Sequence, residues 1–296
     1  MKVRVAAAQY PIDPIASWEA YAEKISRWVG EAAANHAQLL VFPEYGAMEL
    51  ARSFSPEVWS DLQQSIDFIG GLRGSIDTLH AELAEQHQVH IVAASLPERT
   101  EDGAAYNVAR AISPKGRIRE QRKLIMTRFE REEWRVQGGR DVTVFDSRIG
   151  MFGIAICYDA EFPLIARAMS EAGAAMIIVP SCTDSLAGYY RVRVAAQARA
   201  LENQCYVVQS PTVGEAPWSP AVDNNVGAAG VFGPPDLGFP DNGVVALGAM
   251  NEPMWLYADL DLTTVTRVRL EGQVLNNKHW REQPGASTLR ANVVEL

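Results

Sequence analysis

Three side chains that can do covalent chemistry stand at or just beyond the ends of apolar segments. Glu44 follows the apolar run 39–43, Lys123 ends a strand-like segment, and Cys157 follows the run 152–156 and precedes a helical pattern. A thiol nucleophile, a carboxylate base and a cation that stabilises an oxyanion together make a complete acyl-transfer set. Such a set needs no metal and no cofactor, so these residue types indicate nucleophilic hydrolysis of an acyl compound.

The position of Cys157 between a strand and a helix adds a physical argument. Unpaired backbone N–H groups at a helix start carry partial positive charge, so we expect them, with a nearby lysine, to lower the pKa of the thiol. Each residue also has a plainer interpretation. A cysteine at the end of an apolar strand is usually a small core residue, Glu44 after Phe-Pro resembles a solvated loop residue, and Lys123 beside Arg122 resembles a surface residue. Spacing alone leaves these alternatives open.

Composition excludes several classes of protein. Of the 296 residues, 48% are apolar, only three are cysteine, and the net charge is −9. These values argue against a disordered chain, a disulfide scaffold and non-specific nucleic-acid binding. No window approaches the roughly 18 apolar residues of a membrane span, and residues 1–14 do not resemble a signal peptide. We therefore expect no nucleic-acid or membrane partner and a reducing, cytoplasmic location, where a thiolate is available.

Segments of strand length alternate with helical patterns along the chain, without a repeat or a low-complexity linker. Parallel crossovers and hairpins are both predicted, which favours one layered α/β domain with mixed sheets. The pattern alone does not separate a doubly wound sheet from a sandwich of two sheets. The predicted strands are 3–9, 38–42, 89–95, 106–112, 117–122, 142–146, 151–156, 175–180, 205–209, 228–232, 244–248 and 254–259, and the predicted helices are 18–32 (with Ser17 as N-cap), 75–86, 164–171 and 190–203.

Five short motifs occur in a recognisable order: VAAAQ at 5–9, LLVFPE at 39–44, RKL at 122–124, GIAICYD at 153–159 with EFP at 161–163, and ARALEN at 198–203. Together they resemble the nitrilase superfamily of carbon–nitrogen hydrolases, over roughly residues 3–261. The resemblance implies that Glu44 is the general base and that Cys157 attacks the amide carbon to form a thioester. Lys123, assisted by the backbone N–H of Tyr158, would stabilise the oxyanion.

Further site residues follow from the same resemblance. The family often has a second glutamate between the lysine and the cysteine. The phrase Phe-x-Arg-Glu fits Glu132 best, with Glu130 as the alternative and Glu133 as a charged loop residue. An arginine at 191 could pair with a substrate carboxylate, or with acidic residues at a subunit contact. The residues expected near the substrate are Tyr45, Tyr106, Asn107, Cys182, Thr183 and Arg191.

The resemblance also implies an architecture. We expect a four-layer α-β-β-α sandwich of two mixed sheets formed by a single domain, 1–296. Its core would span about 3–261, and the tail 262–296 would pack on the core or on a partner subunit. Members of the family pair through helices, so we expect a homo-oligomer built from dimers. No Cys-x-x-Cys or paired-histidine spacing indicates a metal site, and no cofactor is expected.

The expected activity is hydrolysis of a small linear amide, with release of an acid and ammonia or an amine. N-carbamoyl compounds and nitriles are alternatives, because the same triad serves them. A catalytically silent binding scaffold is an alternative of a different class, and the intact Glu44, Lys123 and Cys157 speak against it. A nucleotide-binding protein would need a phosphate loop after an early strand. The glycine cluster at 70–74 has the wrong spacing for one and is expected to be an ordinary loop.

Overall fold

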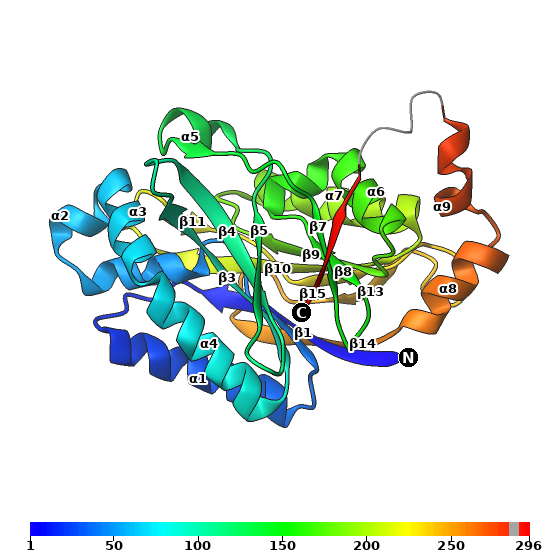
Figure 1. Cartoon of the computed structure of the whole chain (residues 1–296), viewed down its shortest axis with the longest axis horizontal. Coiled ribbons are helices and arrows are strands. Elements are labelled where there is room, and N and C mark those ends of the chain that lie inside the picture. The colour runs from blue at the N-terminus through cyan, green and yellow to red at the C-terminus, as the bar shows by residue number, and fades with distance from the viewer. Residues whose placement is uncertain (284–289) are drawn as a thin grey trace.

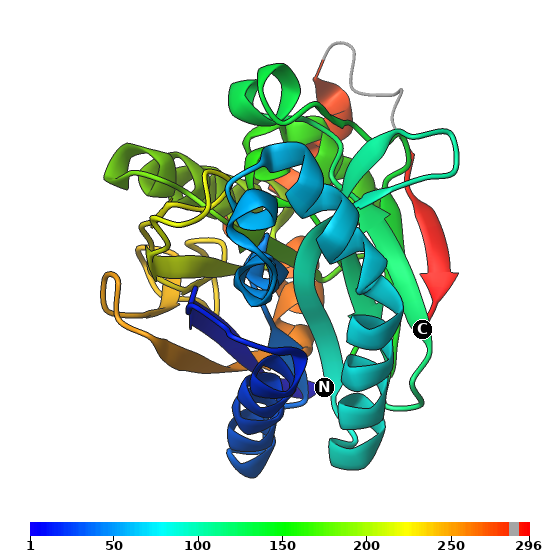
Figure 2. The ribbon, with the colours of Figure 1, turned by 90° about the vertical axis from the view of Figure 1, so that its left-hand side faces the viewer.

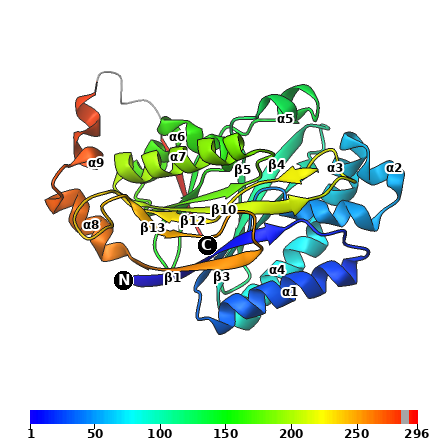
Figure 3. The same ribbon diagram turned by 180° about the vertical axis from the view of Figure 1, so that it is seen from behind.

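A computed structural model describes residues 1–283 and 290–296. Its strands lie between two pairs of helices (Figure 1 and Figure 3). Helices α1 (Trp18–Ala34) and α4 (Arg73–His87) cover one outer face, and they lie next to each other below the strands in Figure 2. Helices α6 (Pro163–Glu171) and α7 (Leu186–Asn203) cover the opposite face. This is the expected α-β-β-α order of layers.

The alternation of side chains along β1 (Lys2–Pro11) explains the layers. Val5 and Ala7 belong to one hydrophobic core, whereas Ala6 and Ala8 belong to another. Successive side chains on a strand point to opposite faces, so β1 contributes to both cores. The first core also contains residues of α6, α7 and the strands beneath them, and the second contains residues of α1 and α4. One sheet face therefore packs on helices and the other packs on the second half of the sandwich.

The first half of the sandwich is built on β1. β1, β2 and β3 run parallel, β4 is antiparallel to β3, and β5 is antiparallel to β4. β14 runs antiparallel to β1 over its whole length. The other strands of this half are β2 (Leu39–Val41), β3 (His90–Arg99), β4 (Ala105–Ile112), β5 (Ile118–Arg122), β6 (Val136–Gln137) and β14 (Met254–Asp261).

The second half contains three parallel strands, β8, β9 and β10, with β7 antiparallel to β8. The two halves join where β10 pairs in parallel with the end of β1, at Tyr10 opposite Thr212. The carboxyl ends of the parallel strands therefore meet at one edge of the molecule. The strands of this half are β7 (Thr143–Asp146), β8 (Phe152–Ile154), β9 (Met176–Ser181), β10 (Tyr206–Glu215), β11 (Asn224–Asn225), β12 (Gly230–Phe232), β13 (Val244–Leu247) and β15 (Asn292–Glu295).

The remaining helices are short or lie at the ends of the sandwich. Among the described residues, no helix is both long enough and apolar enough to cross a membrane. These elements are η1 (Gly46–Ser53), α2 (Pro56–Trp59), α3 (Leu62–Gly71), α5 (Arg128–Glu132), η2 (Cys157–Glu161), α8 (Leu262–Glu271), α9 (Asn276–His279) and η3 (Trp280–Glu282).

The structure confirms most predicted elements and corrects three. Ser17 caps α1 by accepting the N–H of Ala20, and the hairpin β4–β5 is present. The segment 254–259 was expected to form hairpins with the other C-terminal strands, but it pairs with β1. The glycine cluster 70–74 is not a loop, because α3 passes into α4 through Leu72 in a helical conformation. Helices α2, α3, α5, α8 and α9 were not predicted.

The C-terminal segment packs on the same chain in its described parts. β15, which was not predicted, pairs in parallel with β7 and extends the sheet of the second half. Gln204 donates from its side-chain amide to the carbonyls of Val268 and Val274, which fastens the α8 region to the end of α7. Residues 284–289 of the expected tail 262–296 lie outside the described residues.

Candidate active site

Glu44, Lys123 and Cys157 come together at the edge where the parallel strands end. Glu44 follows β2, Lys123 directly follows β5, and Cys157 follows β8 and begins η2. Lys123 Nζ lies 2.7 Å from Glu44 Oε1, and the Glu44 carboxylate acts on the Cys157 thiol by raising its pKa. All three side chains are buried. The strand topology thus unites residues that are far apart in the sequence.

The second glutamate of the cluster is Glu130, which corrects the choice of Glu132. Glu130 Oε2 lies 2.6 Å from Lys123 Nζ, and the side chain is buried. Glu132 lies at the end of α5, is 54% exposed and pairs with Arg128. A helix rotates about 100° per residue, so two positions along α5 move a side chain from the site to solvent. Glu133 is also exposed.

Hydrogen bonds hold both carboxylates in place. Glu44 Oε1 also accepts from Asn107 Nδ2 at 2.9 Å, and Glu44 Oε2 accepts the backbone N–H of Cys182 at 3.0 Å. Glu130 accepts from the Tyr45 hydroxyl at 2.8 Å and from both the N–H and the hydroxyl of Thr127. The carboxylates are therefore preorganised, with Tyr45 and Asn107 as supporting groups.

Cys157 sits in a constrained turn. Its φ is +48°, a left-handed conformation that costs a non-glycine residue free energy and is typical of functional turns. Its sulfur faces the carbonyl oxygen of Cys182 at 3.8 Å. Burial raises the pKa of the Cys157 thiol well above its ordinary value, the Glu44 carboxylate raises it further, and Lys123 opposes both. The expectation of a lowered thiol pKa is therefore wrong, because burial is the largest influence on the thiol.

The pKa values of Glu44, Lys123 and Glu130 are also shifted by burial and by one another. Burial raises the pKa of Glu44; Lys123 opposes the rise, and Glu130 adds to it. Burial acts to lower the pKa of Lys123, but Glu130 and Glu44 raise it well above its ordinary value. Burial acts to raise the pKa of Glu130, but Lys123 and the hydrogen bonds from Thr127 hold it below its ordinary value. The cluster therefore contains a protonated thiol, a carboxyl group with a raised pKa and a lysine ammonium held by two carboxylates.

Asp159 connects the turn of Cys157 to the segment of Lys123, a role that the sequence did not reveal. Its carboxylate accepts the backbone N–H of Leu124 at 3.1 Å, of Ile125 at 2.8 Å and of Ile156 at 3.2 Å. The first two donors directly follow Lys123, and the third directly precedes the cysteine. One buried carboxylate thus fixes the spacing between the cation and the nucleophile.

A pocket of about 510 Å³ opens onto Cys157, Lys123 and Glu44. This volume suits a small molecule. Of the residues expected near the substrate, Tyr45, Cys182, Thr183 and Arg191 line it, as do Tyr158 and Glu130. Asn107 lies behind Glu44 as its hydrogen-bond donor. Burial raises the pKa of Cys182 to about 12, which makes its thiol a poor nucleophile.

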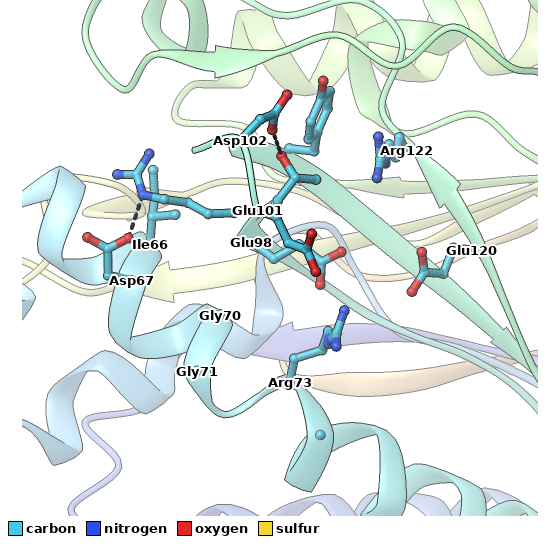
Figure 4. A pocket seen from close by; sticks show the side chains of 14 residues that line it. Ile66, Asp67, Gly70, Gly71, Arg73, Glu98, Glu101, Asp102, Glu120 and Arg122 are labelled. Atoms are coloured by element: carbon cyan, nitrogen blue, oxygen red, sulfur yellow. Dashed lines mark hydrogen bonds and ion pairs between the residues drawn. The ribbon is translucent and has the colours of Figure 1, made fainter. Parts of the chain in front are cut away.

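Tyr106 faces a different cavity, which corrects its assignment to the substrate pocket. This cavity is larger, about 860 Å³, and is lined by the α3–α4 junction, the ends of β3 and β5, and Tyr106 of β4 (Figure 4). Strand neighbours point to opposite faces, so Tyr106 points away from the site that Asn107 supports. The cavity lining contains no cysteine, lysine or histidine, and Arg122 stacks on the Tyr106 ring at 4.2 Å.

Within the described residues, no group of three or more His, Cys, Asp or Glu side chains is arranged to hold a metal ion. The site nonetheless has the parts that an acyl transfer requires. A buried thiol, an adjacent carboxylate base and a fixed ammonium line one pocket, and a substrate carbonyl could approach all three.

Comparisons with known proteins agree with this arrangement. A family model described as carbon-nitrogen hydrolase matches residues 4–269. The chain is 36% identical over 284 residues to "Probable hydrolase YhcX" of Bacillus subtilis, covering 94% of this chain and 54% of that protein. The chain thus spans about half the length of that relative. It is 24% identical over 277 residues to "Omega-amidase NIT2-B" of Xenopus laevis, covering 90% and 92% of the two chains.

Solved structures share the fold. A carbon-nitrogen hydrolase from Helicobacter pylori G27 matches with a TM-score of 0.73 at 21% identity, over 90% of this chain and 92% of that one. Nit3 of Saccharomyces cerevisiae, described as a member of branch 10 of the nitrilase superfamily, matches with a TM-score of 0.69 at 24% identity, over 92% and 96%. With the family model spanning residues 4–269 and the fold shared with these structures, the chain belongs to the carbon–nitrogen hydrolase family.

Proposed function

We propose that this chain hydrolyses a small linear amide through a thioester on Cys157, with Glu44, Lys123 and Glu130 as the other members of the catalytic cluster. One observation carries the proposal: Lys123 Nζ lies 2.7 Å from Glu44 Oε1, and both side chains line the same pocket as the Cys157 thiol. Membership of the carbon–nitrogen hydrolase family supports the class of bond that is cleaved.

In the first half-reaction, Glu44 takes the thiol proton as the sulfur attacks the amide carbon. The carbonyl π electrons move to oxygen, and the ammonium of Lys123, with the backbone N–H of Tyr158, stabilises the oxyanion. The oxyanion then reforms the carbonyl and the C–N bond breaks. The leaving nitrogen takes the proton from Glu44 and departs as ammonia or an amine. The enzyme is left as a thioester on Cys157.

In the second half-reaction, Glu44 takes a proton from water while the water oxygen attacks the thioester carbon. Collapse of the second oxyanion breaks the C–S bond, and the thiolate regains a proton from Glu44. Burial raises the pKa of Glu44, which strengthens the carboxylate as the base that accepts the proton. The products are a carboxylic acid and the regenerated thiol.

An ammonia-release screen over linear amides, N-carbamoyl amino acids and nitriles tests the proposal and separates these substrate classes. We expect turnover of at least one linear amide and none by Cys157→Ala. Cys205→Ala is the matched control, because Cys205 is a buried core cysteine outside the pocket. Intact mass of the enzyme during turnover should show an acyl adduct on Cys157. An adduct on Cys182, or full activity of Cys157→Ala, would overturn the mechanism.

We also propose that the chain forms a homodimer through α7. Apolar side chains recur along its exposed side at helical spacing, and a groove of about 490 Å³ runs beside them. Val194→Asp should convert a dimer into a monomer in light scattering, whereas Leu270→Asp on α8 should not. A wild-type monomer would refute the dimer. The exposed apolar residues of α7 are Leu186, Tyr190, Val194 and Leu201.

A reducing location such as the cytoplasm suits the proposed chemistry. Cys157, Cys182 and Cys205 are all free thiols in the structure, and the mechanism requires Cys157 to remain reduced. Oxidation of Cys157 would remove the nucleophile.

A further inference from the structure

The outer part of the substrate pocket is rich in carboxylates that have no cationic partner. Glu133 follows α5, Asp184 follows β9, and Asp223 precedes β11, so three separate loops bring them to one pocket. All three residues are exposed. Asp184 accepts from the Ser185 hydroxyl, and Asp223 accepts the N–H of Asn224. Among the described residues, none of the three forms an ion pair, so their charges face the pocket mouth and solvent.

The two arginines of the pocket do not balance these charges, because each already faces a carboxylate. Arg128 Nε lies 2.8 Å from Glu132 Oε2, and Arg191 Nε lies 3.6 Å from Glu161 Oε1. Glu161 itself lines the pocket. The outer lining therefore holds four carboxylates, those of Glu133, Glu161, Asp184 and Asp223, against two guanidinium groups. A substrate carboxylate at Arg191 would have to compete with Glu161.

Aromatic rings make up part of the wall of the same pocket. The ring centroids of Tyr45 and Trp134 lie 4.6 Å apart with the ring planes tilted by 41°, and the ring centroid of Phe129 lies 6.0 Å from that of Trp134. All three line the pocket. The faces of aromatic rings attract cations, and the attraction strengthens where water is excluded. The aromatic wall is independent of the carboxylates and favours the same kind of ligand.

We infer that the substrate is an amide that carries a cationic group, an ammonium or a guanidinium, at the end remote from the reacting carbonyl. This inference rests on the proposed function, because it takes the amide carbon to lie at Cys157. With the carbonyl held between Cys157 and Lys123, the other end of a short chain extends past the aromatic wall toward Glu133, Asp184 and Asp223. A cation there gains attraction from a field that repels an anion.

Three amides of matched length test the inference: 5-aminopentanamide, pentanamide and 4-carboxybutanamide, which are cationic, neutral and anionic at neutral pH. We expect kcat/KM to fall in that order, with the cationic amide at least about tenfold better than the anionic one. Raising the ionic strength should shrink the advantage, because salt screens exposed charges. Faster hydrolysis of the anionic amide would overturn the inference and favour Arg191 as a carboxylate-binding residue.

Variants that remove carboxylate charges test whether Asp184 and Asp223 cause the preference for the cationic amide. Asp184→Asn with Asp223→Asn should lower kcat/KM for the cationic amide several-fold and leave that for the neutral amide within about twofold. Glu101→Gln, which removes an exposed carboxylate from the other cavity, is the control and should change neither. Equal rates for all three amides would overturn the cationic preference alone. No turnover of any amide, with no adduct on Cys157, would overturn the proposed function and this inference together.

Discussion

Glu130 Oε2 lies 2.6 Å from Lys123 Nζ, slightly closer than the 2.7 Å between Lys123 and Glu44. Lys123 is thus shared between two buried carboxylates, and of the two it is Glu44 that raises the pKa of the Cys157 thiol. Because Glu130 is held by Tyr45 and Thr127, it fixes the position of the Lys123 ammonium beside Glu44. In the proposed mechanism, Glu130 would therefore act through Lys123 and through its charge.

Replacing Glu130 with Gln should lower kcat at least about tenfold, because Lys123 loses a charged partner and its position relaxes. Glu132→Gln is the matched control, since it changes the same residue type in the same short helix but at an exposed position. We expect that control to keep near-normal rates. Steady-state kinetics on any accepted amide makes the measurement, and equal losses in the two variants would contradict the role of Glu130.

The dependence of kcat/KM on pH should show the electrostatic coupling between Glu44 and Glu130. Glu44 must be ionised to take the thiol proton, and burial with the Glu130 charge raises its pKa. The acid limb of kcat/KM should therefore lie above the ordinary glutamate pKa of about 4.3, with activity lost as pH falls through the raised value. Glu130→Gln removes one cause of the rise, so its acid limb should move to lower pH. A limb that moves upward, or does not move, would rule out this coupling.

Asp159 should behave as a positioning residue. Asp159→Asn places an amide N–H₂ among backbone N–H donors that now bond a carboxylate, and an unsatisfied buried donor costs about 1–3 kcal/mol. We expect kcat to fall about tenfold or more with a smaller change in KM, and a changed rate of Cys157 alkylation. Asp236→Asn is the control, because Asp236 accepts backbone N–H groups of Leu237 and Gln273 away from the site. That variant should lose stability while keeping kcat.

A close backbone contact supports the lysine segment from the other side. A Cβ atom on Gly138 would lie 2.4 Å from the carbonyl oxygen of Leu124, so Gly138→Ala must displace the segment that follows Lys123. We expect a clear loss of kcat in the folded protein. Gly74→Ala has nothing within 4 Å of the new atom and lies in a helix, where alanine is favoured by about 1 kcal/mol. Full activity of Gly138→Ala would contradict the prediction, because it would show that displacing the segment after Lys123 does not affect kcat.

The sequence was sufficient to locate Glu44, Lys123 and Cys157 because each lies in a contiguous motif at a strand end, and the topology brings those ends together. A sequence signal that favours Glu130 over Glu132 was present but was not used. Thr127 and Glu130 form a capping box at the start of α5, and the Thr-x-x-Glu spacing that marks it is visible at 127–130. A capping glutamate is turned toward the chain that enters the helix, which here is the segment after Lys123.

Other features depend on distant contacts that a local pattern does not specify. β14 has the apolar pattern of a strand. Its partner, β1, lies at the other end of the sequence, and the apolar pattern of β14 does not specify that partner. The bonds of Asp159 go to backbone groups, which have no sequence signature. The raised thiol pKa arises from burial, and the acidic pocket mouth arises from three loops that meet only in the folded chain.

Stability should depend on pH through His80, a buried ring whose Nδ1 meets the carbonyl of Ile76 at 2.8 Å. Burial lowers the pKa of His80 to about 4, and the nearby Arg110 adds to the effect, whereas the unfolded chain titrates near 6.5. Below pH 6.5 the unfolded state therefore binds a proton that the folded state rejects, so the free energy of unfolding falls as pH drops toward 4. At about 1.4 kcal/mol per pKa unit, the loss reaches about 3 kcal/mol. Urea unfolding at pH 7 and pH 4.5 measures it. His80→Gln should remove about half of the pH dependence, because burial lowers the pKa of His90 to about 4 as well. An unchanged pH dependence in that variant would show that other groups cause it.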